Sequence, residues 1–354
     1  MIRVGILSFA HYHATFWAEA LNEDPRATLA GIWDANTTRG RDSAARYGAP
    51  FYEDLEALLR VVDAVAVTSE TADHRRLIER AAAHRRHVLC EKPIATTLED
   101  ADAIAAAVAS AGIVFMQSFP KRFDPVNDEI RRLLATKALG RLWLVRVRHG
   151  HRHGLSADFT GGWWTDPARS GGGTLIDEGV HATDFLHWLF GEPETVQATL
   201  SHGLGLAVED GAVATFRWPD GLIADVSTGW TFHAADTSVE LYGTEGSILL
   251  SGVDIASRDI AGNPAPLRVS MATDAERRWV ESTIVPRFIT GKFHHQNAIA
   301  FIDSLSSGKP PPIGIEDGRA ALAMILAAYD AARSRRTVNV AAYTRRSSQE
   351  LRPS

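Results

Sequence analysis

The chain has 354 residues, of which 45% are hydrophobic and 23% charged, a composition typical of a globular protein long enough for two domains. Its formal net charge of −6 argues against nucleic acid as a partner, because a phosphate-binding surface needs a basic excess. No apolar stretch approaches the roughly 18 residues that span a bilayer, so we expect no membrane insertion. Cys90 is the only cysteine, and the first residues resemble a strand rather than a signal peptide. We therefore expect a cytoplasmic protein without disulfides.

Strand-like and helical patterns alternate over the first 120 residues. Strands are predicted at 2–7, 28–33, 63–68, 87–90 and 113–117, with helices after the first strand and near 74–84 and 98–109. Strands of β-branched residues that alternate with helices are typical of right-handed βαβ units and a parallel sheet. The sequence therefore predicts a doubly wound α/β domain over residues 1–120.

The pattern changes after residue 120. Helices are predicted at 125–134, 174–190, 293–306 and 315–333, and strands at 142–148, 195–200, 211–218, 222–230, 238–242 and 247–250. Turn sequences such as Pro219-Asp220-Gly221 separate the later strands, which favours antiparallel pairing. We expect residues 121–354 to form an α+β domain, and we assign no structure to the Arg-rich tail after residue 341.

The turn after the first strand bears on cofactor binding. In dinucleotide-binding folds, glycines at this turn let backbone N–H groups approach the phosphates. Here Ser8, Ala10 and His13 replace all three glycines of the G-x-G-x-x-G pattern. The turn alone leaves two interpretations open: an ordinary polar turn, or a phosphate site in which small residues replace glycine.

Asp34 favours the second interpretation. It ends the second strand, about 20 residues after the turn, where an acid can bind the ribose hydroxyls of adenosine. We expect NAD to be preferred over NADP, because Asp34 would repel the 2′-phosphate and Arg39, five residues further on, is less well placed to bind it.

The tripeptide Glu91-Lys92-Pro93 follows the strand at 87–90. Open α/β sheets bind ligands beyond the carboxyl ends of their strands. A lysine there can be a solvated surface charge, but Pro93 restrains the local chain and Glu91 is a possible partner. This makes Lys92 a candidate active-site residue.

Several motifs occur in a characteristic order along the chain. They are 63–68 followed by His74, 87–93, 171–184 with Gly171-Gly172-Gly173 and Asp177-x-x-x-His181, 242–246, and 301–308. With these motifs the chain resembles the glucose–fructose oxidoreductase, inositol dehydrogenase and rhizopine catabolism (Gfo/Idh/MocA) family over nearly its whole length. The resemblance implies a Rossmann domain, then a domain with a large, open, mostly antiparallel sheet, and NAD(P)-dependent oxidation of a sugar or cyclitol hydroxyl carbon. The departures are the glycine-poor turn and Glu70, where members often have proline.

The resemblance places Lys92 at the nicotinamide and the substrate hydroxyl. We expect the cofactor to be bound by Ser8, Phe9, Ala10, His11, His13, Asp34, Thr68, Ser69, His74, Glu91 and Lys92.

Oxidation of a secondary alcohol needs a base for the hydroxyl proton and a group that stabilises the oxyanion. We expect His181 and Lys92 to take these roles. Asp177 lies four residues before His181, so one helical turn would let it orient the imidazole or bind a substrate hydroxyl. Asp184, three residues further on, could fix the tautomer. For His181 alone, a buried structural histidine is the alternative.

Arg122, Trp163 and Trp164 complete the expected substrate site, together with Asp177 and His181. The paired tryptophans could form an aromatic wall against a sugar ring, or belong to the core. Arg122 lies at the expected domain junction and could bind an anionic substrate group, or form a surface salt bridge instead.

Fourteen histidines raise the question of a metal site. The clusters are His11 with His13, His149 with His151 and His153, and His294 with His295. None has a cysteine partner or a His-Glu-x-x-His pattern, so we expect no metal. His153 and His294 are candidates for substrate contact.

The expected function is therefore that of an NAD-dependent dehydrogenase of a sugar or cyclitol. One alternative is NAD-dependent glycoside hydrolysis or elimination through transient oxidation. Another is a non-catalytic NAD(P)-sensing binding protein, which the presence of both Lys92 and His181 disfavours. We also expect a homodimer or homotetramer formed through the open sheet face, since its strands look insufficiently polar for solvation at Val213, Thr215, Ala224, Val226 and Thr228.

Overall fold

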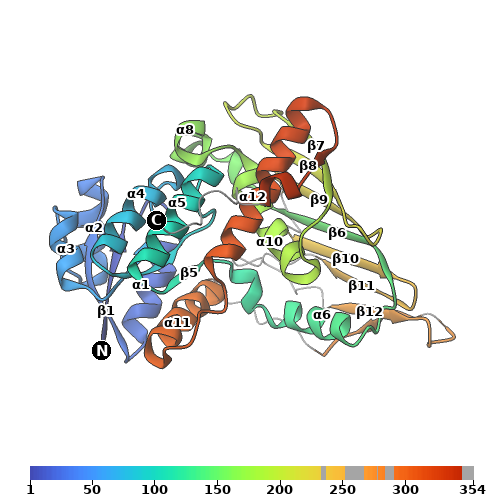
Figure 1. Ribbon diagram of the computed structural model, residues 1–354, viewed down its shortest axis with the longest axis horizontal. Helices are drawn as coiled ribbons and strands as arrows, with labels where there is room; N and C mark the ends of the chain where they lie inside the picture. The colour runs from blue at the N-terminus through green and yellow to red at the C-terminus, as the bar shows by residue number, and fades with distance from the viewer. Residues whose placement is uncertain (233–236, 252–266, 277, 284–290, 345–354) are drawn as a thin grey trace, which may run out of the picture.

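The computed structural model describes residues 1–232, 237–251, 267–276, 278–283 and 291–344, which form two sheets with helices packed on them (Figure 1). Most of the Arg-rich tail lies outside these residues. The described part contains a five-stranded sheet of order β2-β1-β3-β4-β5 and a nine-stranded sheet of order β13-β12-β11-β10-β6-β9-β8-β7-β14. None of the helices in it is long and apolar enough to cross a membrane.

The first sheet is parallel throughout, and the predicted doubly wound domain is confirmed. Its strands are β1 (Ile2–Leu7), β2 (Ala27–Trp33), β3 (Ala64–Val67), β4 (His87–Cys90) and β5 (Phe115–Gln117). Its helices are α1 (Ala14–Glu23), α2 (Thr37–Tyr47), α3 (Leu55–Val61), α4 (His74–Ala83) and α5 (Leu98–Ala111). The sequence pattern missed α2, because Gly40 and Ala44 are its buried residues and so few positions give a weak apolar period.

The second sheet is antiparallel except for the parallel pair β6 and β9. Its strands are β6 (Leu142–Gly150), β7 (Thr195–Ser201), β8 (Gly211–Arg217), β9 (Ile223–Gly229), β10 (Thr237–Gly243), β11 (Gly246–Ser251), β12 (Arg268–Met271), β13 (Val280–Glu281) and β14 (Val338–Asn339). The main helices after residue 120 are α6 (Pro125–Ala135), α9 (Thr174–Asp177), α10 (Gly179–Phe190), α11 (Lys292–Ser307) and α12 (Ile315–Ser334). The predicted strands between 142 and 250 are confirmed.

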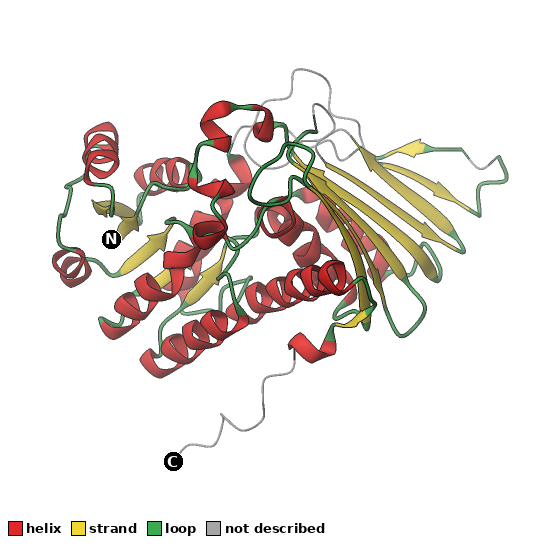
Figure 2. Cartoon of the chain, turned by 90° about the horizontal axis from the view of Figure 1, so that it is seen from above, coloured by secondary structure: helices red, strands yellow, loops and turns green. Residues whose placement is uncertain are grey.

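Helices cover one face of this sheet, and the other face is open (Figure 2). Ala224, Val226 and Thr228 are buried beneath the helices, so their expected position on the open face is wrong. Val213 is 47% exposed, and Thr215 shares its outward face on β8. The open face is therefore more polar than the sequence suggested.

The two late helices connect the sheets. α12 packs against α10 and β7 of the second sheet and against α5 and β5 of the first domain, while α11 packs on α1. The N–H of Gln117 on β5 donates to the carbonyl of Ile313, just before α12. These contacts hold the first domain and the large sheet at a fixed separation, and the candidate site lies where they meet.

Candidate active site

A cavity of about 260 Å³ lies between the first domain and the helix-covered face of the large sheet. Its wall combines the turn after β1, the end of β4, the end of β6 and the segment where α9 gives way to α10. The ionisable side chains that line it are His11, Tyr12, His13, Lys92, His149, His151, His153, Asp158, Asp177, Glu178 and His181. The structure thus brings together the three residues expected to be catalytic, Lys92, Asp177 and His181.

Lys92 is fixed by Asp177. Its Nζ donates to Asp177 Oδ1 at 2.8 Å and to the Asp177 carbonyl at 3.0 Å. Burial opposes the charged form, but Asp177, Glu178 and Glu91 outweigh it and raise the pKa of Lys92 above its ordinary value. Asp177 Oδ2 accepts the indole N–H of Trp230 at 3.0 Å. Lys92 is therefore an ammonium ion held in one position in the cavity wall.

The prediction of one continuous helix from 174 to 190 is wrong. The chain breaks at Glu178, between α9 and α10, so Asp177 and His181 do not share one helical turn. α9 is held from behind by Glu209, whose carboxylate accepts the N–H groups of Gly173 and Leu175. A side chain at position 173 would collide with the carbonyl of Glu209, which explains the glycine there. As a result Asp177 turns toward Lys92 and does not orient His181.

His181 is buried and packs parallel to His149, with ring centroids 4.9 Å apart. Burial, Lys92 and His149 lower the pKa of His181 well below its ordinary value. Its Nδ1 has no hydrogen-bond partner in the described part of the chain. His181 is therefore neutral at physiological pH and able to accept a proton.

Glu178, which is not among the expected site residues, joins two further histidines. Its carboxylate lies 2.8 Å from His149 Nδ1 and 3.3 Å from His151 Nε2. Burial lowers the pKa of His149 to about 4. Burial also opposes charge on His151, but Glu178 and Asp177 raise the pKa of His151 to about 9. Two signals in the sequence were available. The spacing of His149 and His151 places both side chains on one strand face, and Asp177 and Glu178 form an acidic pair.

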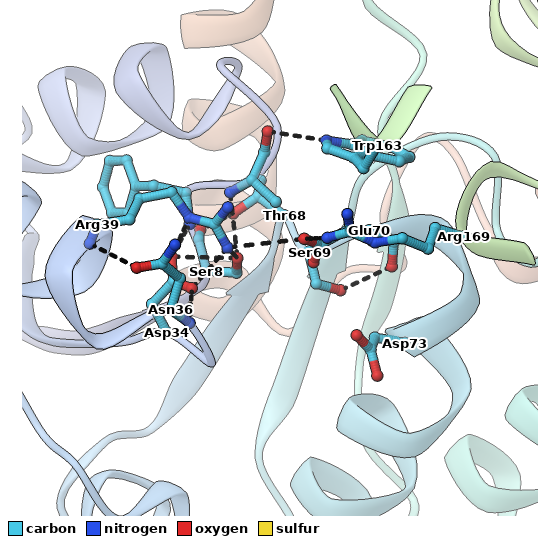
Figure 3. Close-up of polar contacts among 12 residues, drawn as sticks. Ser8, Asp34, Asn36, Arg39, Thr68, Ser69, Glu70, Asp73, Trp163 and Arg169 are labelled. Atoms are coloured by element: carbon cyan, nitrogen blue, oxygen red, sulfur yellow. Dashed lines mark hydrogen bonds and ion pairs between the residues drawn. The ribbon is translucent and has the colours of Figure 1, made fainter. Parts of the chain in front are cut away.

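The turn after β1 is closed by hydrogen bonds of its own (Figure 3). Ser8, at the first glycine position, has the left-handed backbone (φ 80°) that glycine would otherwise supply. The N–H of Phe9 donates to Asp34, that of Ala10 to Ser8 Oγ, and that of His11 to the carbonyl of Thr68. Ser8 thus supplies the left-handed backbone that the first glycine would supply, and a phosphate bound here would replace these internal partners.

Arg39 lies directly on Asp34, and whether it could also bind a 2′-phosphate stays a prediction. Its Nε and Nη2 donate to the two carboxylate oxygens of Asp34 at 2.7 and 2.6 Å (Figure 3). The N-terminal turn of α2 folds back because Asn36 caps it, and this brings Arg39 beside the end of β2. Arg39 therefore already occupies the carboxylate of Asp34 that is expected to bind the ribose hydroxyls.

Two residues from beyond residue 120 reach the same edge of the first domain (Figure 3). Trp163 donates its indole N–H to the carbonyl of Ala10 at 3.1 Å, and Arg169 forms an ion pair with Glu70. Trp164 stacks on Trp163 and lines the cavity. The expected aromatic wall is thus provided by Trp164, while Trp163 connects the two parts of the molecule.

Other predicted site residues support the site from outside the cavity. His74 is buried, with Nδ1 3.0 Å from the carbonyl of Pro93 and Nε2 3.3 Å from that of Ser69. Thr68 donates its hydroxyl to the carbonyl of Ser8 at 2.6 Å. These contacts brace the strand ends.

Arg122 lies in a buried ion-pair network. Its side chain is 7% exposed and donates to Asp184 at 2.6 and 3.1 Å and to Asp317 at 2.8 Å. It is not part of the cavity wall, and Asp184 is engaged with Arg122 rather than with His181. The expected roles of Arg122 toward substrate and of Asp184 toward the tautomer are therefore not observed.

Comparison with known proteins gives a consistent family assignment. Residues 2–119 match the oxidoreductase family with an NAD-binding Rossmann fold, and residues 128–249 match the GFO/IDH/MocA C-terminal domain. Myo-inositol 2-dehydrogenase of Thermotoga maritima is 24% identical, over 96% of this chain and 98% of that protein. The 1,5-anhydro-D-fructose reductase of Ensifer adhaerens is 33% identical, over 53% of this chain and 56% of that protein.

Solved structures show the same fold. The aldose–aldose oxidoreductase of Caulobacter crescentus, complexed with glycerol, superimposes with a TM-score of 0.82 and 25% identity, over 96% of this chain and 99% of that one. Levoglucosan dehydrogenase in complex with NADH and L-sorbose gives a TM-score of 0.83 at 22% identity, over 96% and 99% of the two chains. The chain belongs to the Gfo/Idh/MocA family of NAD-binding oxidoreductases.

Proposed function

We propose that the protein transfers a hydride between a hydroxyl carbon of a sugar or cyclitol and NAD. The observation that carries this proposal is the pairing, in one cavity, of a fixed ammonium group on Lys92 with a neutral imidazole on His181. Relatives named as inositol and sugar dehydrogenases support the substrate class.

The residues around the first turn fit an NAD site. Ser8 has the backbone conformation of a phosphate-binding turn, and Asp34 ends β2 where the ribose is expected. Ser8, Phe9, Ala10 and Asp34 would hold the pyrophosphate and the ribose. NAD, when bound, supplies the hydride acceptor.

The cavity residues account for the proton and the developing charge. His181 accepts the hydroxyl proton because burial keeps its imidazole neutral. Lys92 donates to the substrate oxygen and stabilises its negative charge, while Asp177 and Trp230 hold the ammonium group in place. Trp164 offers an apolar surface for a ring.

The direct test is a panel of aldoses, inositols and sugar acids assayed for NAD reduction by absorbance. We expect turnover with at least one member of the panel, and loss of that turnover in Lys92→Ala. Absence of turnover with every member, in a protein shown to bind NAD, would contradict net dehydrogenation.

A second candidate is a redox-neutral reaction, in which transient oxidation at one carbon permits elimination at another. Glu178 with His149 and His151 favours it, because these residues place a second acid–base group in the same cavity. Tightly retained NAD and conversion of a glycoside without net NADH would support it.

A further inference from the structure

A second histidine cluster lies at the side of the cavity that the turn after β1 forms. His11 and His13 come from the turn after β1, Glu91 follows β4, and His294 comes from α11; each is at most 2% exposed. His11, His13 and Glu91 each offer one ligand atom, and the three atoms lie within 4.8 Å of one another. His13 Nδ1 is 3.2 Å and His11 Nε2 4.0 Å from Glu91 Oε1. Segments distant in the sequence thus converge on one carboxylate.

Among the described residues, the side chains within ion-pair distance of the Glu91 carboxylate are imidazoles, with His13 Nδ1 at 3.2 Å and His11 Nε2 at 4.0 Å, and no lysine or arginine lies that close. The backbone N–H of Lys92 is its other donor. Lys92, its neighbour in the chain, directs its ammonium group to Asp177. A buried carboxylate that no lysine or arginine pairs with is costly, and a proton or a bound cation removes that cost.

The imidazoles around Glu91 have ring nitrogens available in the interior. His11 Nε2 and both ring nitrogens of His294 are buried and have no hydrogen-bond partner among the described residues. Neutral imidazole nitrogens with one carboxylate form a donor set that divalent transition metals prefer, and a His₂Glu set leaves a coordination position open. The ring of His294 packs 3.8 Å from that of His13 and restrains its orientation.

We propose that His11, His13 and Glu91 bind a divalent transition-metal ion of the Zn²⁺ class, with an open coordination position on the cavity side. His11 and His13 line the cavity next to Lys92, so an oxygen of a ligand in the cavity can reach the ion. The ion neutralises Glu91 and fixes the turn after β1. The proposal does not depend on which substrate or reaction the cavity serves.

The acidic cluster across the cavity is the competing site. Ligand atoms of His151, Asp177 and Glu178 also lie within metal-binding distance of one another. Lys92 and Trp230 already donate to Asp177, however, and His149 and His151 already contact Glu178. The ammonium group of Lys92 thus balances charge there, whereas Glu91 has only imidazoles and one backbone N–H around it among the described residues.

Binding should be visible in tryptophan fluorescence. His11 Nδ1 accepts the N–H of His13 at 3.2 Å, which leaves Nε2 toward Glu91. An ion on Nε2 requires the ring proton to move to Nδ1, and this breaks the bond and shifts the turn. The His11 ring contacts Trp164 edge-on, with centroids 4.7 Å apart. The shift therefore changes the environment of an indole.

The experiment uses the full chain, treated with a chelator and titrated with Zn²⁺ by calorimetry, with metal content measured by mass spectrometry. We expect about one ion per chain and a higher Tm with metal, because an ion that binds only the folded state stabilises it. Co²⁺ should give a ligand-field absorption band and quench tryptophan fluorescence.

Two near-isosteric variants test the ligands. His13→Asn and Glu91→Gln should each weaken Zn²⁺ binding by more than the roughly 100-fold that loss of an outer-sphere partner costs. His84→Ala is the matched control. It removes a histidine that does not line the cavity and whose Nε2 lies 2.6 Å from the carboxylate of Glu56. His151→Ala should also retain the ion.

Three results would overturn the proposal. One is the absence of stoichiometric Zn²⁺ and of any Co²⁺ signal in the unmodified protein, a readout that needs no variant to fold. Another is binding that survives both His13→Asn and Glu91→Gln. The third is binding that His151→Ala abolishes while the folded His13→Asn variant retains it, which would assign the ion to the competing cluster.

Discussion

In one cavity Lys92 is protonated and positively charged while His181 is deprotonated and neutral, because their neighbours differ. Lys92 faces the carboxylate of Asp177, and this attraction overcomes the cost of burial. His181 faces the ammonium group and another imidazole, so burial and repulsion act in the same direction. An acid and a base with separated pKa values are what a proton-transfer step needs.

His181→Ala should lower kcat by roughly 10²–10⁴, the usual contribution of a positioned general base. Because the pKa of His181 is well below its ordinary value, the rate of the unmodified enzyme should fall only at correspondingly acidic pH. The variant should lack that acidic limb in its pH–rate profile. A kcat within about threefold of the unmodified enzyme would assign the proton to another residue.

His151 should make stability depend on pH. Its folded pKa of about 9 lies above the ordinary value, so its contribution is fully present below about pH 6.5 and is lost as pH rises through 9. The shift corresponds to about 3 kcal/mol at most. Urea unfolding from pH 6 to 10 should show this loss in the unmodified protein and a smaller one in His151→Gln. Parallel curves would contradict the pairing with Glu178.

Asp34 and Arg39 should set the cofactor preference. We expect a higher kcat/KM with NAD than with NADP, because Asp34 repels the 2′-phosphate and occupies Arg39. Asp34→Ala frees the guanidinium and should shift the ratio toward NADP. Kinetics with both cofactors give the ratio. A preference for NADP in the unmodified enzyme would contradict the role of Asp34.

At the scale of single elements, the turn after β1 shows how a fold keeps its geometry without the usual residues. Ser8 adopts a left-handed backbone that costs a non-glycine residue about 1 kcal/mol or more. Its hydroxyl offsets this strain by donating to Asp34 and by accepting from Ala10. The turn is thus specified by hydrogen bonds instead of by glycine.

Substitutions at Ala10 test whether the pyrophosphate lies on this turn. Ala10→Gly should leave NAD affinity unchanged or improve it modestly, and Ala10→Val should weaken it strongly, since a branched side chain enters the phosphate position. Titration followed by tryptophan fluorescence gives both dissociation constants. Equal affinities for Gly, Ala and Val would mean that the pyrophosphate binds elsewhere.

At the scale of the whole molecule, the large sheet has one face covered by helices and one face without them (Figure 2). On the open face Arg146 lies 3.5 Å from Asp225 and 3.7 Å from Glu240, and the apolar side chains of Val213 and Trp143 are exposed. A surface that combines charged and exposed apolar side chains is typical of an interface between protein chains and not of a domain core.

We therefore still expect a homodimer or homotetramer formed through the open face. Light scattering at micromolar concentration should give a mass at least about twice the 38.5 kDa of one chain. Val213→Lys with Trp143→Lys should reduce that mass, and Ile299→Lys on α11, away from the sheet, serves as the surface control. A monomer mass for the unmodified protein would contradict the expectation.

The order of strands and helices could be predicted from the sequence, because hydrophobic period and turn residues act over a few positions. The same local signals placed Lys92 at a strand end, whereas the resemblance to the Gfo/Idh/MocA family placed His181 in the same site. They did not reveal the break at Glu178, since α9 is held from behind by Glu209, some 30 residues away in the chain.

Only the tertiary structure decided which charges pair. Arg39 binds Asp34, Arg122 binds Asp184, and Asp177 binds Lys92. Sequence spacing gives a side chain's reach but not the direction from which another segment approaches. The energy of an ion pair falls with the distance between its charges and depends on how deeply they are buried. The partner of a charged side chain is therefore set by the packing of elements that meet only in the folded chain.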